Sequence, residues 1–205
     1  MRPLPRLHAV TDGRVLADPD LGRKAAAIAA LGPATALHLR DRSATMQHLA
    51  EIGRRFIALT RPPEAALLVN GRADLACALG AQGVQLAAGD LAVADARQVL
   101  GKGRIGRSVH SLAEARAAVD EGADFLLAGN IYATPSHPGR PAAGVGFISA
   151  CAVLGRPVIA IGGITAERAV ECRDAGAWGV AAIRALWDAD DPYAAGRALL
   201  APWAE

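Results

Sequence analysis

The sequence predicts a single-domain (β/α)₈ barrel spanning residues 1–205. Short apolar runs alternate with amphipathic segments of helical periodicity along all 205 residues. Such alternation is typical of a parallel sheet covered by helices. There are eight strand–helix units, the number that closes into a barrel. A doubly wound open sheet is the main alternative.

Each expected element has a simple sequence signature. The expected strands are the apolar runs at residues 7–10, 36–39, 66–69, 83–86, 104–109, 124–128, 157–161 and 179–182. The expected helices are the amphipathic segments near residues 18–31, 46–60, 73–79, 92–100, 112–121, 146–154, 166–175 and 192–203. The longest connection, residues 129–145, is rich in Gly and Pro. Loops this long in compact domains are typically binding loops or lids.

Composition narrows the class of protein. The net charge of +2 is too small to favour a nucleic acid or an anionic membrane as partner. The longest uncharged stretches fall short of the ~18–20 apolar residues that a membrane span needs. Residues 1–10 show no signal peptide, and the three widely spaced cysteines match neither a disulfide framework nor a zinc site. We therefore expect a cytoplasmic protein with reduced, mostly buried thiols.

Alternation within the strands predicts where the polar side chains point. In the second strand Leu37 and Leu39 share one face, and His38, Arg40 and Arg42 share the other. The outer face of a barrel packs under helices, so the polar face should line the interior or the mouth at the carboxyl ends of the strands, where barrel active sites lie. The third and fifth strands add Asn70, Ser108 and His110 to this face.

A Gly-Gly turn follows the seventh strand. Gly162 and Gly163 separate that strand from Thr165, which we expect to cap the next helix. Backbone N–H groups near such glycines and a helix N-terminus favour an anion, and barrels often bind phosphate after strands seven and eight. Residues 181–184 could supply further N–H donors. A tight turn that only needs positive φ is the alternative.

His110 stands between the fifth strand and a helix. Ser111 and Glu114 form a capping box, so His110 lies beside the positive end of the helix dipole, which disfavours imidazolium. A neutral base is expected there, with a merely structural histidine as the alternative. Asp90 precedes the segment 91–100 and is expected to be its N-cap rather than a ligand.

Arg40 and Arg42 would place two guanidinium groups in the barrel mouth. Arginine pairs bidentately with carboxylate or phosphate, which favours an anionic substrate. An Arg40–Asp12 ion pair between barrel layers is the alternative. Asn70 and Gly71 form a dipeptide typical of a turn.

These motifs together resemble the thiamine phosphate synthase superfamily of (β/α)₈ barrels, and within it the thiazole tautomerase branch. The resemblance runs essentially from end to end of the chain. It rests on the segments His8–Asp12, Leu37–Arg42, Val69–Arg72, Gly83–Leu86, Ile105–Ser111, Gly129–Thr134 and Ile161–Ile164.

Departures from the synthase pattern favour the tautomerase branch. Gly71 stands where synthases resemble Asn-Asp-Arg with a magnesium-binding Asp, and Asp90 alone remains of that carboxylate pair. His38 and Arg42 replace a Gln and a Lys, and His137 stands at a further Lys position. Pyrophosphate departure depends on a metal to neutralise charge, so these changes argue against it. Arg184 replaces the usual Ser after the eighth strand.

The resemblance therefore implies a proton shift that needs no metal and no cofactor. A carboxylated dihydrothiazole phosphate, a small-molecule substrate, would become the aromatic carboxythiazole phosphate. His110 would move the proton, with His38 as a further acid to consider, and Arg40 and Arg42 would hold the carboxylate. The remaining substrate-binding residues would be His38, Asn70, Ser108, Asn130, Thr134, Gly144, Gly162, Gly163, Ala182 and Ile183. The resemblance also implies a homodimer.

Two other functions remain open on the sequence. One is an active, magnesium-dependent thiamine phosphate synthase, which would draw its metal ligands from Asp90 and from substrate phosphates. The other is a non-catalytic barrel that binds a phosphorylated compound of the thiamine pathway and regulates a partner. Pyrophosphate release in the presence of Mg²⁺ would identify the synthase.

Overall fold

The computed structural model describes residues 3–60, 65–135, 139 and 141–204. Eight parallel strands pair in sequence order, and the last pairs with the first to close a barrel. The barrel prediction is confirmed, and the open-sheet alternative is wrong. The strands are β1 (Leu7–Val10), β2 (Thr35–Leu39), β3 (Ala66–Asn70), β4 (Gly83–Leu86), β5 (Arg104–Val109), β6 (Phe125–Gly129), β7 (Val158–Ile161) and β8 (Gly179–Ala182).

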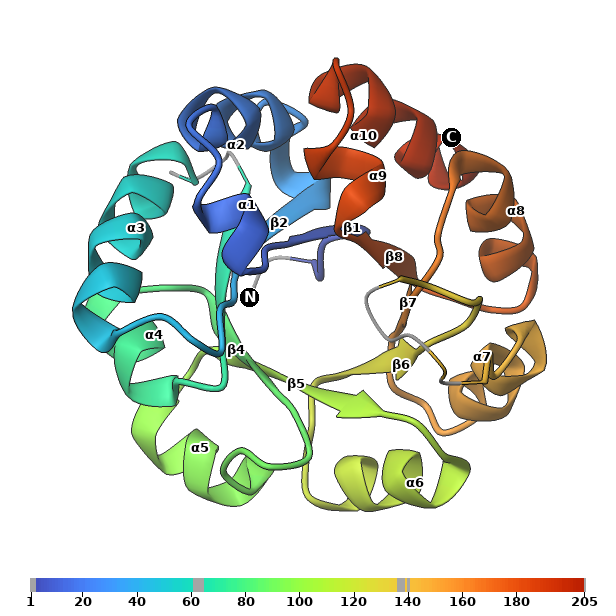
Figure 1. Ribbon diagram of the computed structural model, residues 1–205. Coiled ribbons are helices and arrows are strands. Elements are labelled where there is room, and N and C mark those ends of the chain that lie inside the picture. Colours follow the sequence, from blue (N-terminus) through green and yellow to red (C-terminus); the bar gives the residue numbers. More distant parts are fainter. Residues whose placement is uncertain (1–2, 61–64, 136–138, 140, 205) are drawn as a thin grey trace.

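Helices surround the barrel on all sides (Figure 1). They are α1 (Gly13–Leu16), α2 (Leu21–Ala29), η1 (Gly32–Ala34), α3 (Met46–Leu59), α4 (Ala73–Leu79), α5 (Val93–Leu100), α6 (Leu112–Asp120), α7 (Val145–Ala152), α8 (Ala166–Asp174), α9 (Arg184–Trp187), α10 (Pro192–Leu200) and η2 (Ala201–Trp203). The expected helices agree within a few residues. The sequence did not predict α1, η1 and α9, because three or four residues are too few to show helical periodicity.

Two apolar layers hold the barrel together. The larger lies between the sheet and the helices and contains Leu37, Leu39, Leu67 and Val69 from adjacent strands. The smaller fills the barrel interior, and its buried members are Leu4, Val10, Ala36, Leu68, Phe125, Leu127, Ile159 and Ala181. The expected alternation of faces is therefore confirmed, and His38 lies on the interior face, fully buried.

Helix capping agrees with the sequence at two positions and differs at a third. Ser111 accepts the Glu114 N–H at 3.2 Å, and Thr165 caps α8 as expected. Asp90 does not cap α5, which begins at Val93 and has no side-chain cap. Its carboxylate instead accepts the Ala87 N–H at 2.6 Å, because the chain between Asp90 and the helix is two residues too long for an N-cap.

The described residues include no helix long and apolar enough to cross a membrane. The three cysteines are free thiols. Cys151 and Cys172 are buried, and burial raises the pKa of each to about 11, whereas Cys77 is exposed.

Candidate active site

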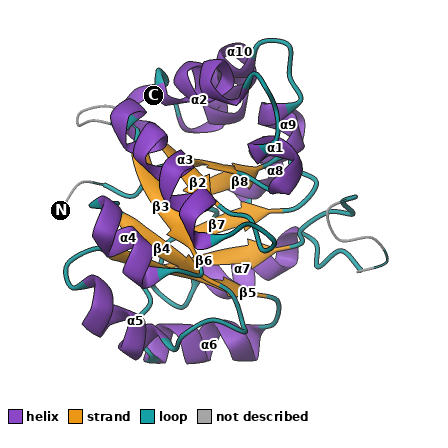
Figure 2. Cartoon of the chain, turned by 60° about the vertical axis from the view of Figure 1, so that its left-hand side comes forward, coloured by secondary structure: helices purple, strands orange, loops and turns teal. Residues whose placement is uncertain are grey.

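A cavity of about 460 Å³ opens at the carboxyl ends of β6, β7 and β8. Figure 2 shows the barrel from the side, with the short helices α1 and α9 near this end. This is the end of a barrel at which active sites lie. The expected site residues that line the cavity are His110, Asn130, Thr134, Gly162, Gly163, Ala182 and Ile183.

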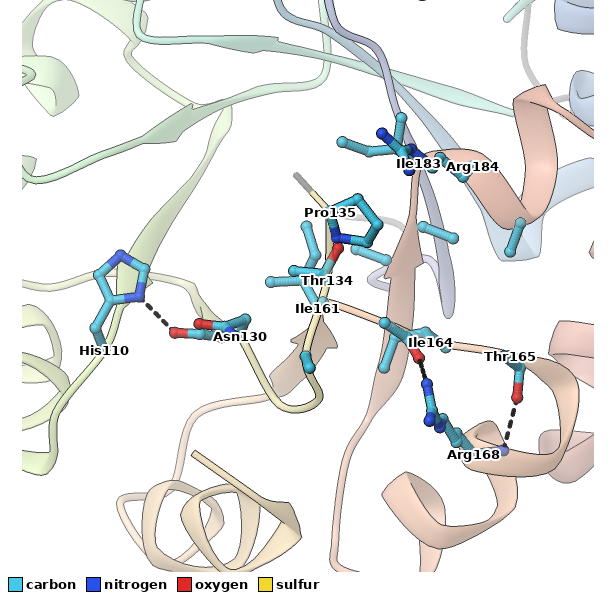
Figure 3. A pocket seen from close by; sticks show the side chains of 17 residues that line it. His110, Asn130, Thr134, Pro135, Ile161, Ile164, Thr165, Arg168, Ile183 and Arg184 are labelled. Carbon is cyan, nitrogen blue, oxygen red and sulfur yellow. Dashed lines mark hydrogen bonds between the residues drawn. The ribbon is translucent and has the colours of Figure 1, made fainter. Parts of the chain in front are cut away.

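His110 is held at the wall of this cavity by its backbone and its ring (Figure 3). Its N–H donates to the Glu114 carboxylate at 2.9 Å, which completes the capping arrangement. Its Nδ1 lies in a hydrogen bond to the carbonyl oxygen of Gly129. A carbonyl can only accept, so Nδ1 carries the proton and Nε2 of the neutral ring keeps its lone pair.

Gly162 and Gly163 have φ angles of 101° and 66°, in the region that favours glycine. A Cβ on Gly162 would lie 2.8 Å from the Asn130 Cα, and one on Gly163 would lie 2.6 Å from the Ala133 carbonyl oxygen. The turn therefore requires glycine at both positions, as expected if they serve a tight turn with positive φ. The same lack of side chains brings the backbone to the cavity wall.

Arg168 supports this turn and was not among the expected site residues. Its guanidinium donates to the Gly163 carbonyl at 2.6 Å and lies 4.5 Å from the centre of the Tyr132 ring. The C=O and N–H of a trans peptide point in opposite directions, so this bond turns the Ile164 N–H away from Arg168. The sequence signal that could have indicated Arg168 is its position in the first turn of the helix that Thr165 caps.

Arg184 adds a second cation to the cavity wall. It begins α9, which one residue separates from the end of β8, and it is exposed. Figure 3 shows Ile183 and Arg184 on one side of the cavity and Arg168 on another. The cavity thus combines a glycine turn with two arginines, an arrangement that favours a phosphate group.

A second group of expected residues lies at the mouth near β2. Arg40 is half-buried just past the end of that strand, and burial and the charge of Arg42 lower its pKa. Asp12 does not form the alternative ion pair with Arg40 within the described chain; its carboxylate caps α1 through the Val15 N–H. Arg42 is exposed.

The polar residues of β2, β3, β4 and β5 bond in pairs across neighbouring strands rather than line the 460 Å³ cavity. His38 Nδ1 lies 3.0 Å from the Asn70 side-chain amide. Ser108 Oγ accepts from the Gln85 amide at 3.0 Å. These side chains form a polar layer inside the barrel.

One expected position on the connection after β6 is absent from the cavity wall, and another is not among the described residues. Gly144 does not line the cavity, and its N–H donates to the Ile131 carbonyl at 3.0 Å. His137 lies outside the described residues.

Comparisons with known proteins assign the family. The family model described as thiamine monophosphate synthase matches residues 7–186, so the chain belongs to this family. A thiamine-phosphate synthase of Mycolicibacterium vanbaalenii is 42% identical over 80% of this chain and 72% of its own. One of Chloroflexus aurantiacus is 38% identical over 96% and 91%. The solved thiamine phosphate pyrophosphorylase of Pyrococcus furiosus is 32% identical, with a TM-score of 0.83, over 96% and 94%.

These relatives correct the expected activity. A thiazole tautomerase, an isomerase, was expected because Gly71, His38, Arg42 and His137 depart from the synthase pattern. Relatives at 38–42% identity over most of the chain are instead named thiamine-phosphate synthase. The tautomerase interpretation is therefore wrong, and the synthase alternative is favoured. These few side-chain changes were given more weight than the rest of the chain.

Proposed function

We propose that this protein is a thiamine-phosphate synthase. It would join a pyrimidine-methyl pyrophosphate to a thiazole phosphate and release pyrophosphate. The names of its relatives support this transferase activity, and the site contributes one observation of its own. The barrel mouth carries two separate pairs of arginines, Arg168 with Arg184 and Arg40 with Arg42. A monophosphate and a pyrophosphate would require two such anion-binding regions.

The two regions differ in construction and suit the two substrates. The cavity at β7 and β8, with its glycine turn, Arg168 and Arg184, would hold the single phosphate of the thiazole. Arg40 and Arg42, past the end of β2, would hold the pyrophosphate, because guanidinium forks match phosphate oxygens. Arg40 is half-buried, which strengthens its attraction for an anion relative to an exposed cation.

The reaction itself needs no net proton transfer. The bond between the pyrimidine methylene and the pyrophosphate oxygen breaks, and the electron pair leaves with the pyrophosphate. The thiazole nitrogen then bonds to the methylene carbon. Arg40 and Arg42 would stabilise the departing charge, and the lone pair on His110 Nε2 would stabilise positive charge on the pyrimidine. The barrel's main task is to position the two reactants.

Synthase chemistry implies a magnesium ion, and the described residues fit it only in part. They include no group of three or more His, Cys, Asp or Glu side chains able to hold a metal. Mg²⁺ is, however, often bound by one or two carboxylates together with substrate phosphates. One oxygen of Asp90 accepts the Ala87 N–H, and the other lies 3.1 Å from where a Gly71 Cβ would be. Asp90 would therefore be the protein ligand, and the ion would neutralise pyrophosphate charge.

The test is a direct assay of product formation. The purified chain would be incubated with the pyrimidine pyrophosphate, thiazole phosphate and Mg²⁺, with thiamine phosphate and pyrophosphate quantified separately. We expect equal amounts of the two products, and loss of most turnover in Asp90→Asn. Binding of thiazole phosphate without either product would reject the synthase and favour the non-catalytic binding protein.

A further inference from the structure

Two fully buried histidines form a hydrogen-bonded chain across the first three strands of the barrel. His8 on β1 and His38 on β2 are both 0% exposed. His8 Nδ1 lies 2.7 Å from His38 Nε2, and His8 Nε2 lies 3.1 Å from the carbonyl oxygen of Pro5. The chain ends at Asn70, whose side-chain oxygen Oδ1 is placed 3.0 Å from His38 Nδ1. The mechanism above uses neither histidine.

The proton positions along this hydrogen-bonded chain follow from its end at the Pro5 carbonyl. The Pro5 carbonyl can only accept, so His8 Nε2 carries a proton and the neutral ring accepts at Nδ1. His38 must then donate from Nε2, which leaves a lone pair on its Nδ1. Both rings are neutral, because burial lowers the pKa of His8 well below its ordinary value and that of His38 to about 4.

This proton order decides which way the Asn70 amide faces. A lone pair on His38 Nδ1 needs a donor, and the only donor on the amide is its NH₂ group. The oxygen and nitrogen of a side-chain amide have nearly the same shape. Turning the Asn70 amide by half a turn puts its NH₂ group where Oδ1 is placed, which preserves the 3.0 Å contact and supplies that donor. The amide oxygen then occupies the outer position. An oxygen facing His38 would require either an imidazolium or an unprotonated His8 Nε2 against Pro5 O.

Asn70 is the last residue of β3 and is half-buried, so its outer amide atom lies at the mouth. We infer that His8 and His38 are positioning residues that hold the Asn70 amide oxygen toward the mouth, where it selects a substrate carrying an N–H donor. An anionic oxygen would be repelled at this point and directed to the arginines. The inference rests on the proposed function, in which the aminopyrimidine of the pyrophosphate substrate supplies the N–H.

The first test measures proton positions in the unliganded protein. Nitrogen-15 NMR of labelled histidine at pH 7 should show both rings neutral, with protons on Nε2. In Asn70→Asp the carboxylate cannot donate, so the His38 signals should shift to those of a protonated Nδ1. An Nδ1-protonated His38 in the wild-type chain would overturn the assignment, whatever the enzyme's activity.

The second test measures selection. Affinities of the aminopyrimidine pyrophosphate and its deamino counterpart would be compared by calorimetry. We expect the wild type to prefer the amino compound by about tenfold, the ordinary effect of one well-placed hydrogen bond. Asn70→Ala and His38→Leu should lose this preference, and His38→Gln, which can accept from Asn70, should retain part of it.

The outcomes separate the inference from the proposed function. Equal affinity of the wild type for the two pyrimidines would overturn the selective role of Asn70. Variants that lower the melting temperature but keep the tenfold preference would show that the histidines serve stability alone. A retained preference without thiamine phosphate formation would support the inference and reject the synthase.

Discussion

The two sides of the barrel mouth are built in different ways. On the β7–β8 side, a glycine turn brings backbone to the cavity, and Arg168, which also lines the cavity, fixes that turn. On the β1–β3 side, buried His8 and His38 reach outward to Asn70, and Arg40 stands beside them. One side therefore depends on the absence of side chains, and the other on their hydrogen bonds.

This contrast shows how one fold can separate affinity from selectivity. Backbone N–H groups suit any phosphate, so the β7–β8 side can supply affinity without reading the rest of a ligand. An amide held in one orientation distinguishes a donor from an acceptor, so the β1–β3 side can discriminate between ligands. Substitutions on each side should affect these two properties separately.

The largest effect is expected at the glycine turn. Gly163→Ala would place a Cβ 2.6 Å from the Ala133 carbonyl oxygen and 2.8 Å from the Tyr132 Cβ, so the turn must move. We expect thiazole phosphate affinity, measured by calorimetry, to fall by roughly 100-fold, as for the loss of charged hydrogen bonds. Gly32→Ala is the matched control, because Gly32 also has positive φ, at 81°, with nothing within 4 Å of its Cβ position. Equal losses in both variants would contradict a role for the turn in binding.

A smaller effect is expected at the arginines near β2. Arg40→Gln should raise the Kd for inorganic pyrophosphate by roughly 30-fold, because a half-buried cation is lost. Arg42→Gln should raise it less than threefold, since exposed charges are screened. Thiazole phosphate affinity should stay unchanged in both variants. Similar pyrophosphate affinities for the two would show that burial does not set their contributions.

The smallest of these effects concerns the stability of the β1–β3 side. The folded pKa of His38 is about 4, below its ordinary 6.5, so the unfolded chain binds more protons between these values and stability falls as pH falls. This one group should lower the free energy of unfolding by about 1.4 kcal/mol between pH 7.5 and 5.5. Urea denaturation of the wild type and His38→Gln measures the difference. Identical pH dependence in both would show that His38 is not held neutral by burial.

Much of the fold was predictable because its signals are local. Strands such as Val158–Ile161 are continuous apolar runs, and alternation placed Leu37 and His38 on the correct faces. Capping by Ser111 and Thr165 also depends on neighbours only three residues away. Asp90 was misassigned because its actual partner, the Ala87 N–H, belongs to a turn that the sequence pattern does not reveal.

The site was predictable only in part. The glycines and His110 stand in recognisable motifs and do line one cavity. Arg168 was missed because its role depends on contacts with Gly163 and Tyr132, which lie on different loops. The activity was misjudged because single side chains, such as Gly71, cannot show how much of a site the rest of the barrel preserves.

The sequence by itself determined the barrel and the faces of its strands, since periodicity and turn chemistry act over a few residues. Only the tertiary structure decided that His8, His38 and Asn70 form one hydrogen-bonded chain, because they lie about 30 residues apart along the sequence. Strand pairing brings them together, and burial excludes the water that would otherwise take their hydrogen bonds. The direction of the Asn70 amide is a property of that enclosed chain.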